Sequence, residues 1–343
     1  MKRLLNTLYV TTQGAYLNKE GEAIVVSVEH EVRLRLPVHT VSGIVCFGNI
    51  MISPFLLGHC AENHVTITHL TENGRFLARV EGPVSGNILL RREQYRRSAD
   101  PDQSAGIARA MVAGKLLNSR TVLQRALRDH PDIPGGEKVE QSILRLDRQV
   151  QALQESASLD VVRGLEGDAS HTYFDVFDHL VTAQKESFFF HGRSRRPPMD
   201  NLNALLSFVY TLMVHDARSA CEGVGLDPQA GFLHRDRPGR PSLALDLMEE
   251  FRSFLGDRLA LTLINLRQVQ GKGFKTTESG AVEMTDDTRK ELLVAYQKRK
   301  QEPIEHPFIN EKVEIGLLFH VQALLLARHI RGDLDGYPPF IWK

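Results

Sequence analysis

The stretch "AGIARAMVAGKLLNSRTVLQRAL", residues 105–127, decides the fold class because the hydrophobic pattern of the chain changes there. Its apolar residues recur at intervals of three and four, which is the spacing of an amphipathic helix. The same spacing returns in "VEQSILRLDRQVQALQES" (139–156), "NALLSFVYTLMVHDARSAC" (203–221) and "VEIGLLFHVQALLLARHIRG" (313–332). The chain is therefore predicted to be helical from about residue 95 onward.

Residues 4 to about 82 have the pattern of strands instead. "NTLYVTT" (6–12), "AIVVSVE" (23–29), "VRLRLP" (32–37) and "GIVCFGN" (43–49) are short, rich in β-branched residues and partly alternating. "NKEG" (18–21) and "TENGR" (71–75), the second through Asn73-Gly74, are typical of hairpin turns. One helix is predicted within this region, with Ser53 as its N-cap and Pro54 at its first position.

The two patterns together predict an α+β protein, with a β-rich N-terminal domain followed by a larger all-helical domain. The stretch "EGPVSGN" (81–87) breaks the strand pattern and indicates a connection. We expect a β-rich domain at 1–84, a linker at 85–95 and a helical domain at 96–343.

Composition limits the classes of function. Lys plus Arg equals Asp plus Glu, at 42 each in 343 residues, so any nucleic-acid partner must be recognised by local clusters of positive charge. Cys46, Cys60 and Cys221 form no C-x-x-C pair, which favours buried thiols in a reduced compartment. No stretch approaches the ~20 apolar residues of a membrane span, so we expect a cytoplasmic protein.

Two acidic residues follow Ser242, the predicted N-cap of a helix. Ala244, Leu247, Met248, Phe251 and Leu255 share one face of that helix, and Asp246 and Glu249 share the opposite face. Taken alone, this pattern favours a solvated acidic face, because charged residues are mostly exposed. A metal site would need a cation between the carboxylates and further ligands from elsewhere.

Glu166 carries a stronger signal. It lies two helical turns before Tyr173, so a continuous helix would turn its carboxylate toward an apolar face. A carboxylate in that position must be paired, protonated or bound to metal. If Gly164 and Gly167 end the helix instead, Glu166 lies in an exposed loop. Spacing alone leaves both interpretations open.

His234 stands in a loop with several arginines. Arg235, Arg237 and Arg240 lie within six residues of it, and Arg252 follows the acidic helix positions. Arginine forks suit phosphate oxygens, so these four are candidate phosphate contacts. An exposed basic loop without a ligand is the alternative.

Three segments resemble, in their order and spacing, the CRISPR-associated spacer-acquisition nuclease and integrase, the adaptation protein common to most CRISPR systems. They are "VVRGLEGDASHTYFDVF" (161–177), "RRPPMDNLNALLSFVYTLM" (195–213) and "GFLHRDRPGRPSLALDLMEEFR" (231–252). The ending "LLLARHIRGDLDGYPPFIWK" (324–343) resembles the version found in type I-C systems. The likeness covers nearly the whole chain.

The resemblance implies a metal site. The family's Glu, His and acidic ligands correspond to Glu166, His234 and Glu249, where many members have Asp at the last position. Asp246 matches a second acidic position near the metal or the DNA. An imidazole with carboxylates suits Mg²⁺ or Mn²⁺. Two carboxylates clustered without a cation are expected to repel each other and to have raised proton affinity.

The reaction implied is attack by the 3′-hydroxyl of a short invader-derived DNA on a phosphodiester at a repeat edge. The implied partners are double-stranded DNA (protospacer and CRISPR repeat), a second copy of the chain bound through the β-rich domain, and a small ferredoxin-fold adaptation protein. A generic metal-dependent nucleic-acid phosphodiesterase, a non-catalytic DNA-binding scaffold and a purely structural helical protein are the alternatives.

Overall fold

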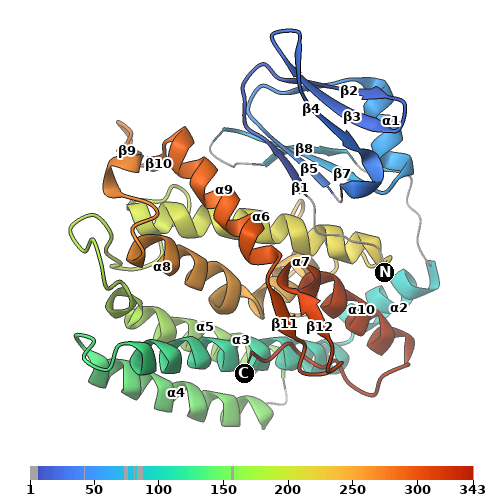
Figure 1. Ribbon diagram of the computed structural model, residues 1–343. Coiled ribbons are helices and arrows are strands. Elements are labelled where there is room, and N and C mark those ends of the chain that lie inside the picture. Colours follow the sequence, from blue (N-terminus) through green and yellow to red (C-terminus); the bar gives the residue numbers. More distant parts are fainter. Residues whose placement is uncertain are drawn as a thin grey trace. The chain divides into compact units, whose positions relative to one another are not determined.

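The structure, a computed structural model, describes residues 7–41, 43–72, 76–80, 82, 88–155 and 158–342. Packing divides the chain into two compact units (Figure 1). The first comprises residues 1–86 with the short segments 296–302 and 314–317, and the second comprises 87–295, 303–313 and 318–343. The elements confirm the predicted α+β class, with strands first and helices after.

The N-terminal unit contains two four-stranded sheets, in the orders β1-β5-β7-β8 and β4-β3-β2-β6. In the first sheet β7 and β8 are antiparallel and the other pairs are parallel, whereas in the second only β2 and β6 are parallel. The elements are β1 (Thr7–Val10), β2 (Tyr16–Glu20), β3 (Ala23–Val28), β4 (Glu31–Pro37), a 3₁₀ turn (Val38–Thr40), β5 (Gly43–Phe47), β6 (Met51–Ile52), α1 (Pro54–Glu62), β7 (Thr66–Leu70) and β8 (Phe76–Val80).

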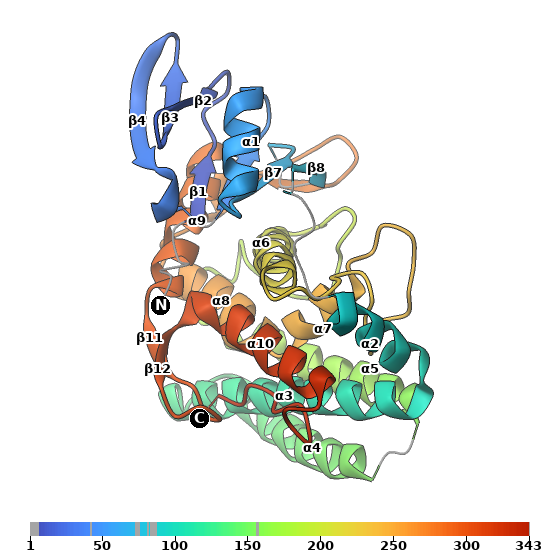
Figure 2. The same cartoon turned by 90° about the vertical axis from the view of Figure 1, so that its right-hand side faces the viewer.

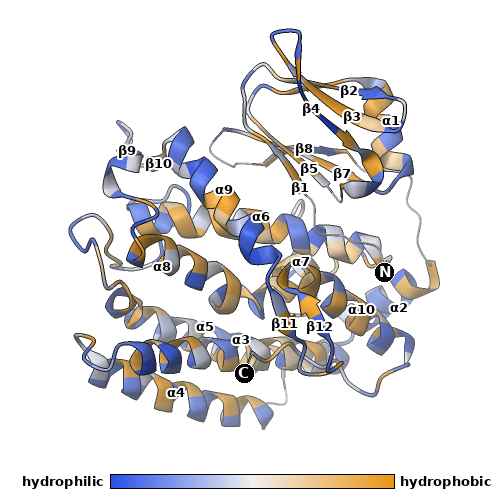
Figure 3. Cartoon of the chain, viewed as in Figure 1, coloured by the Kyte–Doolittle hydropathy of each residue, from blue (hydrophilic) through white to orange (hydrophobic). Residues whose placement is uncertain are grey.

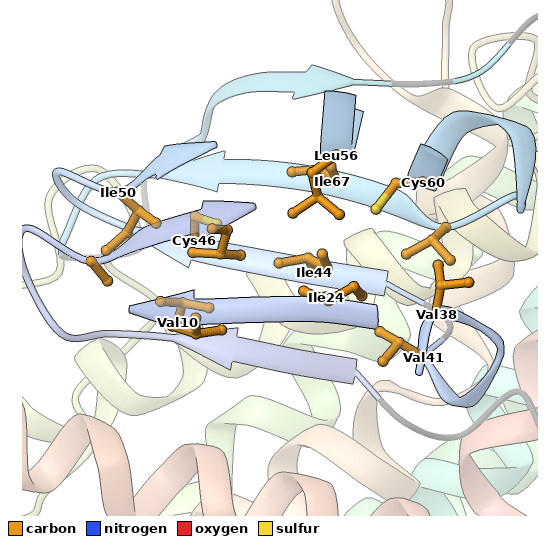
Figure 4. Close-up of a cluster of buried hydrophobic side chains, with 14 residues drawn as sticks. Val10, Ile24, Val38, Val41, Ile44, Cys46, Ile50, Leu56, Cys60 and Ile67 are labelled. Atoms are coloured by element: carbon orange, nitrogen blue, oxygen red, sulfur yellow. The ribbon is translucent and has the colours of Figure 1, made fainter. Parts of the chain in front are cut away.

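Local sequence signals account for this unit. The hairpin predicted at "NKEG" is present between β2 and β3, but Asn18, Lys19 and Glu20 belong to β2. The turn begins only at Gly21, which takes the left-handed conformation. Ser53 caps α1 by accepting a hydrogen bond from the Leu56 amide, with Pro54 at the first position, as predicted. The predicted Asn73-Gly74 turn lies outside the described residues. Figure 4 shows the core of this unit, where apolar side chains such as Val10, Ile24 and Ile44 gather between the strands.

The rest of the chain is mainly helical, with four short strands that the sequence patterns did not predict. The helices are α2 (Ile88–Ala99), α3 (Pro101–Asp129), α4 (Gly136–Gln154), α5 (Leu159–Asp175), α6 (Asn201–Gly223), α7 (Ser242–Glu249), α8 (Arg258–Asn265), α9 (Asp286–Lys300) and α10 (Leu318–Arg331). A π-helical turn (Arg252–Asp257) precedes α8, 3₁₀ turns cover Phe177–Leu180, Gly271–Gly273 and Ile315–Leu317, and the strands are β9 (Phe274–Thr276), β10 (Val282–Met284), β11 (Pro303–Glu305) and β12 (Lys312–Glu314).

Polar caps begin several of these helices. Asp100 caps α3 ahead of Pro101, Ser158 caps α5, and Asp200 caps α6. The predicted linker at 85–95 is wrong from Ile88 on, where α2 begins. Leu90 and Gln94 of α2 are buried, and the Gln94 amide donates to the carbonyls of Asp227 and Ala230 at 2.8 Å each. These contacts tie α2 to residues 227–230.

The long helices surround α7. Helices α3, α4 and α5 pack against one another, and α7 packs against α3, α6 and α10 (Figures 1 and 2). Figure 3 shows hydrophobic and hydrophilic residues alternating along α4, whose buried side includes Val139, Ile143 and Leu146. Because neighbours cover α7 on several sides, its polar residues are buried along with its apolar ones.

Two predictions on composition can be compared with the structure. Cys46, Cys60 and Cys221 are buried free thiols, as expected, and burial raises the pKa of Cys60 to about 11. Over the described ranges, no helix is both long and apolar enough to cross a membrane.

Candidate active site

Helix α5 presents Glu166 between the interior and the surface. The helix runs unbroken from Leu159 to Asp175, so the interpretation in which Gly164 and Gly167 end it is wrong. Both glycines are exposed and have open space around the position of a Cβ atom. The side chain of Glu166 is 25% exposed, while Ala169 and Tyr173 on the same side are buried. Its carboxylate therefore lies at the boundary between core and solvent.

Helix α7 buries the two acidic residues that its sequence pattern placed on a solvated face. Asp246 is 0% and Glu249 is 2% exposed, so the expectation of a solvated acidic face is wrong. Ser242 is the first helical residue, and Pro241, not Ser242, occupies the N-cap position. A carboxylate that is fully buried must have partners, and both acids have them.

The ammonium group of Lys115, on α3, joins Glu166 to Glu249. Lys115 Nζ contacts Glu166 Oε1 and lies 2.7 Å from Glu249 Oε2. Ser170 Oγ also donates to Glu166 Oε1, at 3.0 Å. Lys115 itself is 7% exposed. The structure thus brings Glu166 and Glu249 together around one cationic atom.

Arg252 completes the environment of Glu249. Its Nη1 lies 2.7 Å from Glu249 Oε1, and its guanidinium stacks over the ring of Tyr210 at 4.6 Å. Burial of Glu249 disfavours its charge, but the charges of Arg252 and Lys115 outweigh burial and hold its pKa well below the ordinary range. The predicted rise in proton affinity is therefore wrong for Glu249. Arg252, predicted as a phosphate contact, points its guanidinium at this carboxylate.

His234 is held by Asp246. The Asp246 carboxylate accepts hydrogen bonds from the backbone amides of Phe232 (2.6 Å), Leu233 (3.0 Å) and His234 (2.9 Å), and His234 Nδ1 lies 2.6 Å from Asp246 Oδ1. The nearby Gly231 has no room for a side chain, because a Cβ atom there would lie 2.8 Å from Asp246 Oδ2. An ionised carboxylate only accepts, so Nδ1 donates to Asp246, and in the neutral imidazole this tautomer leaves the lone pair on Nε2.

An open pocket of about 340 Å³ connects His234 to Glu166. Most of the residues that line this pocket are arginines. The lining residues are Arg163, Glu166, Leu233, His234, Arg235, Arg237 and Arg240. Arg163 Nε donates to the Leu233 carbonyl at 2.7 Å, and Arg235 lies 3.4 Å from Asp160. Partial burial, followed by the charge of Arg237, lowers the pKa of Arg240. Such a concentration of guanidinium groups suits an anion.

The residues suit a divalent cation in chemistry, although they do not form a closed ligand shell. Within the part of the chain that the structure describes, no three His, Cys, Asp or Glu side chains converge in a geometry that could hold a metal ion. The space between the two glutamates is taken by Lys115. Two carboxylates gathered on a single positive charge, together with an imidazole whose Nε2 can bind a metal when the ring is neutral, nevertheless form a donor set typical of Mn²⁺ or Mg²⁺.

Sequence reasoning missed Lys115. A signal was present, because Lys115 shares the helix face of the buried Met111 and Val112, four and three residues earlier. A lysine on an apolar face must be paired or must reach solvent. Its partners come from α5 and α7, so no local pattern identifies them.

The sequence is similar to a known protein family along most of its length. The family model described as "CRISPR associated protein Cas1" matches residues 8–298. A protein of Chlorobaculum tepidum named "CRISPR-associated endonuclease Cas1 1" is 59% identical over 343 residues, which is the full length of both chains.

Solved structures share the fold. A casposase bound to integration product superposes with a TM-score of 0.85 at 21% identity, over 98% of this chain and 94% of that one. A Cas6-RT-Cas1–Cas2 complex gives a TM-score of 0.83 at 19% identity, over 100% of this chain and 36% of the matched one. The family model matches residues 8–298, which is most of the sequence, and the Chlorobaculum tepidum protein matches over its full length. The chain therefore belongs to the Cas1 family of CRISPR-associated endonucleases.

Proposed function

We propose that this protein is a metal-dependent DNA endonuclease and integrase in which Glu166, His234 and Glu249 hold Mg²⁺ or Mn²⁺. The observation that carries the proposal is the bond between His234 Nδ1 and Asp246 at 2.6 Å, in a pocket shared with Glu166 and several arginines. A histidine that ligates a metal usually donates its other ring N–H to a carboxylate. Asp246 would orient His234 in this way, because backbone amides of the same loop hold the Asp246 carboxylate in place through hydrogen bonds.

The proposed reaction is attack of a DNA 3′-hydroxyl on a phosphodiester at the edge of a CRISPR repeat. A divalent cation bound there would neutralise the phosphate and lower the pKa of the attacking oxygen. Arg235, Arg237 and Arg240 would bind the DNA backbone through phosphate oxygens. With water in place of the hydroxyl, the same residues would support cleavage. Arg252 is better placed to hold Glu249 than to reach DNA.

Strand transfer on a branched DNA in Mn²⁺ tests this proposal. We expect His234→Ala and Glu166→Gln to abolish transfer, and Asp246→Asn to lower it by about 10- to 100-fold. Asp236→Asn is the matched control, because Asp236 is an exposed carboxylate of the same loop. Near-normal transfer by a folded His234→Ala protein would contradict the assignment. Cleavage without preference for a repeat edge would favour a generic phosphodiesterase, and DNA binding without reaction would favour a scaffold.

The phosphate contacts can be tested separately by the salt dependence of DNA binding. Replacing one phosphate-contacting residue, as in Arg237→Gln, should weaken binding to unrelated sequences alike and lower the salt slope by about 1. Arg128→Gln, at the exposed end of α3, is the control for loss of one charge. A loss confined to one DNA sequence would show that Arg237 reads bases.

The proposed partners are double-stranded DNA, a second copy of this chain and a small ferredoxin-fold adaptation protein. Support for the last comes from the similar fold found within a Cas6-RT-Cas1–Cas2 complex. The N-terminal unit exposes Phe55 (83%) and Met51 (59%), which suits the proposed homodimer through this unit. Phe55→Glu should then shift the sedimentation coefficient toward the monomer, and an unchanged dimer would place the interface elsewhere. The type I-C assignment and the cytoplasmic location remain predictions from the sequence.

A further inference from the structure

Lys115 occupies the place where the proposed metal site needs a cation. Its Nζ contacts one oxygen of Glu166 and lies 2.7 Å from one oxygen of Glu249, and these are two of the three proposed ligands. The side chains of Lys115 and Glu249 are 9% and 3% exposed, so solvent screens this contact little. An ammonium group and a divalent cation cannot occupy this position together, because like charges repel strongly at contact distance.

The cluster is electrically balanced without a metal. Glu166 and Glu249 carry two negative charges, and Lys115 and Arg252 carry two positive charges in contact with them. A divalent cation entering this cluster must break both contacts of Lys115, the ion pair with Glu249 and the hydrogen-bonded ion pair with Glu166, and the second is of the stronger kind in proteins. The stability of the lysine bridge therefore acts against metal binding.

The structure also provides a second place for the ammonium group. Lys115 lines a small cavity of about 20 Å³, whose other walls include Ser170, Tyr210 and Asp257. This volume suits one water molecule or one ammonium group. The Asp257 carboxylate would receive the displaced charge beside Arg252, which lines the same cavity, so the lysine need not leave the protein interior.

We propose that Lys115 is an internal counter-cation that competes with the divalent ion for Glu166 and Glu249, and so sets the metal affinity of the site. This inference rests on the proposed function. It makes Lys115 a positioning residue that keeps the two carboxylates together when no metal is bound. Metal can bind only when Lys115 has left the two carboxylates. The apparent metal affinity is therefore reduced by the fraction of molecules in that state. Removing the ammonium should therefore tighten metal binding.

The test measures the dissociation constant for Mn²⁺, from the EPR signal of the free ion, without DNA and without any assay of activity. We expect Lys115→Met to bind Mn²⁺ about tenfold more tightly than wild type, which corresponds to removal of a competing contact worth about 1.4 kcal/mol. Lys115→Arg keeps the charge and should bind no more tightly than wild type. Lys138→Met, an exposed lysine of α4, controls for the change in net charge.

The outcomes separate this inference from the proposed function. Lys115→Met leaves two glutamates with one cation fewer, so its melting temperature in chelator should fall while its gain on adding Mn²⁺ should rise. Where that variant does not fold, Lys115→Gln keeps a hydrogen-bond donor without the charge. Unchanged or weaker Mn²⁺ binding in the folded neutral variant overturns the role of Lys115. Mn²⁺ binding by wild type that Glu166→Gln does not weaken overturns the metal site itself.

Discussion

The two units of the molecule have interiors of different kinds. The core cluster of the N-terminal unit consists of apolar side chains with two cysteines, among them Leu17, Ile24 and Ile44. Around α7, by contrast, Asp246, Glu249, Glu250 and Asp257 are all at most 2% exposed. Burying charge costs free energy that burying an apolar side chain does not, so the helical unit holds these groups for a reason other than stability.

The buried acids of the helical unit are not equivalent, and their partners separate them. Glu249 faces two cations and stays ionised. Glu250 accepts from the Tyr337 hydroxyl at 2.5 Å and from the Phe340 amide at 2.6 Å, and burial raises its pKa to about 8. Neighbouring positions at the end of α7 therefore differ: Glu249 is a charged carboxylate at the site, and Glu250, which follows the helix, favours the neutral form beside the C-terminal tail. Charge is retained where the proposed chemistry needs it.

The largest effect is expected from removing the charge of Glu249. Glu249→Leu leaves Lys115 and Arg252 buried with too little negative charge, which should lower the free energy of unfolding by about 3–5 kcal/mol. Urea unfolding in the presence of chelator measures this loss. Glu249→Gln keeps one acceptor oxygen, which can face only one of the two cations, and should lose less than Glu249→Leu. A Glu249→Leu protein as stable as wild type would show that the charge cluster is unimportant for folding.

A cavity in the apolar core of the N-terminal unit should affect stability alone. Leu17 is fully buried in β2, and Leu17→Ala should lower the free energy of unfolding by about 2–5 kcal/mol. Mn²⁺ affinity of the folded protein should not change, because none of the proposed ligands lies in this unit. The comparison between the units fails if Leu17→Ala also weakens Mn²⁺ binding.

A smaller effect, and one that depends on pH, is expected at Asp257. Burial raises its pKa to about 6, although Tyr210 and Arg252 act in the opposite direction. Because the folded protein holds this proton where the unfolded chain has lost it, the contribution of Asp257 to wild-type stability falls as pH rises from about 4 to about 6. Asp257→Asn removes this loss, so its stability relative to wild type should be about 1–3 kcal/mol more favourable at pH 7.5 than at pH 4.5.

Urea unfolding of both proteins at the two pH values measures this difference. Asp236→Asn, an exposed carboxylate, should show a much smaller change between the same pH values. A stability difference for Asp257→Asn that is the same at both pH values would show that Asp257 ionises normally.

The N-terminal unit could be predicted from sequence because its signals are local. The Ser53-Pro54 start of α1 and the turn that includes Gly21 depend on residues adjacent in the chain. The direction of Glu166 could be predicted only in part, because its spacing to Tyr173 turns it inward if the helix continues through Gly164 and Gly167, and spacing alone leaves that open. The helix at 88–99 was missed although a local signal was present, since Glu93 pairs with Arg96 and Arg97 at helical spacing.

The burial of the site could not be predicted from periodicity. The polar side of α7 resembles a solvated face, and only its packing against α3, α6 and α10 turns Asp246 and Glu249 inward. The link between Lys115 and Glu166 spans 51 positions of sequence, so no pattern within a single helix contains it. Helix periodicity indicates which residues share a face, and only tertiary structure shows what covers that face.

The most direct test of the metal site is a set of melting curves with Mn²⁺ and with chelator, for wild type, Glu166→Gln and Glu249→Gln. Binding to the folded state alone should stabilise wild type by roughly 2.7 kcal/mol at a hundredfold excess over the dissociation constant. We predict that each substitution removes most of the Mn²⁺-dependent rise in melting temperature. Equal rises in all three proteins would show that these two glutamates do not form the site.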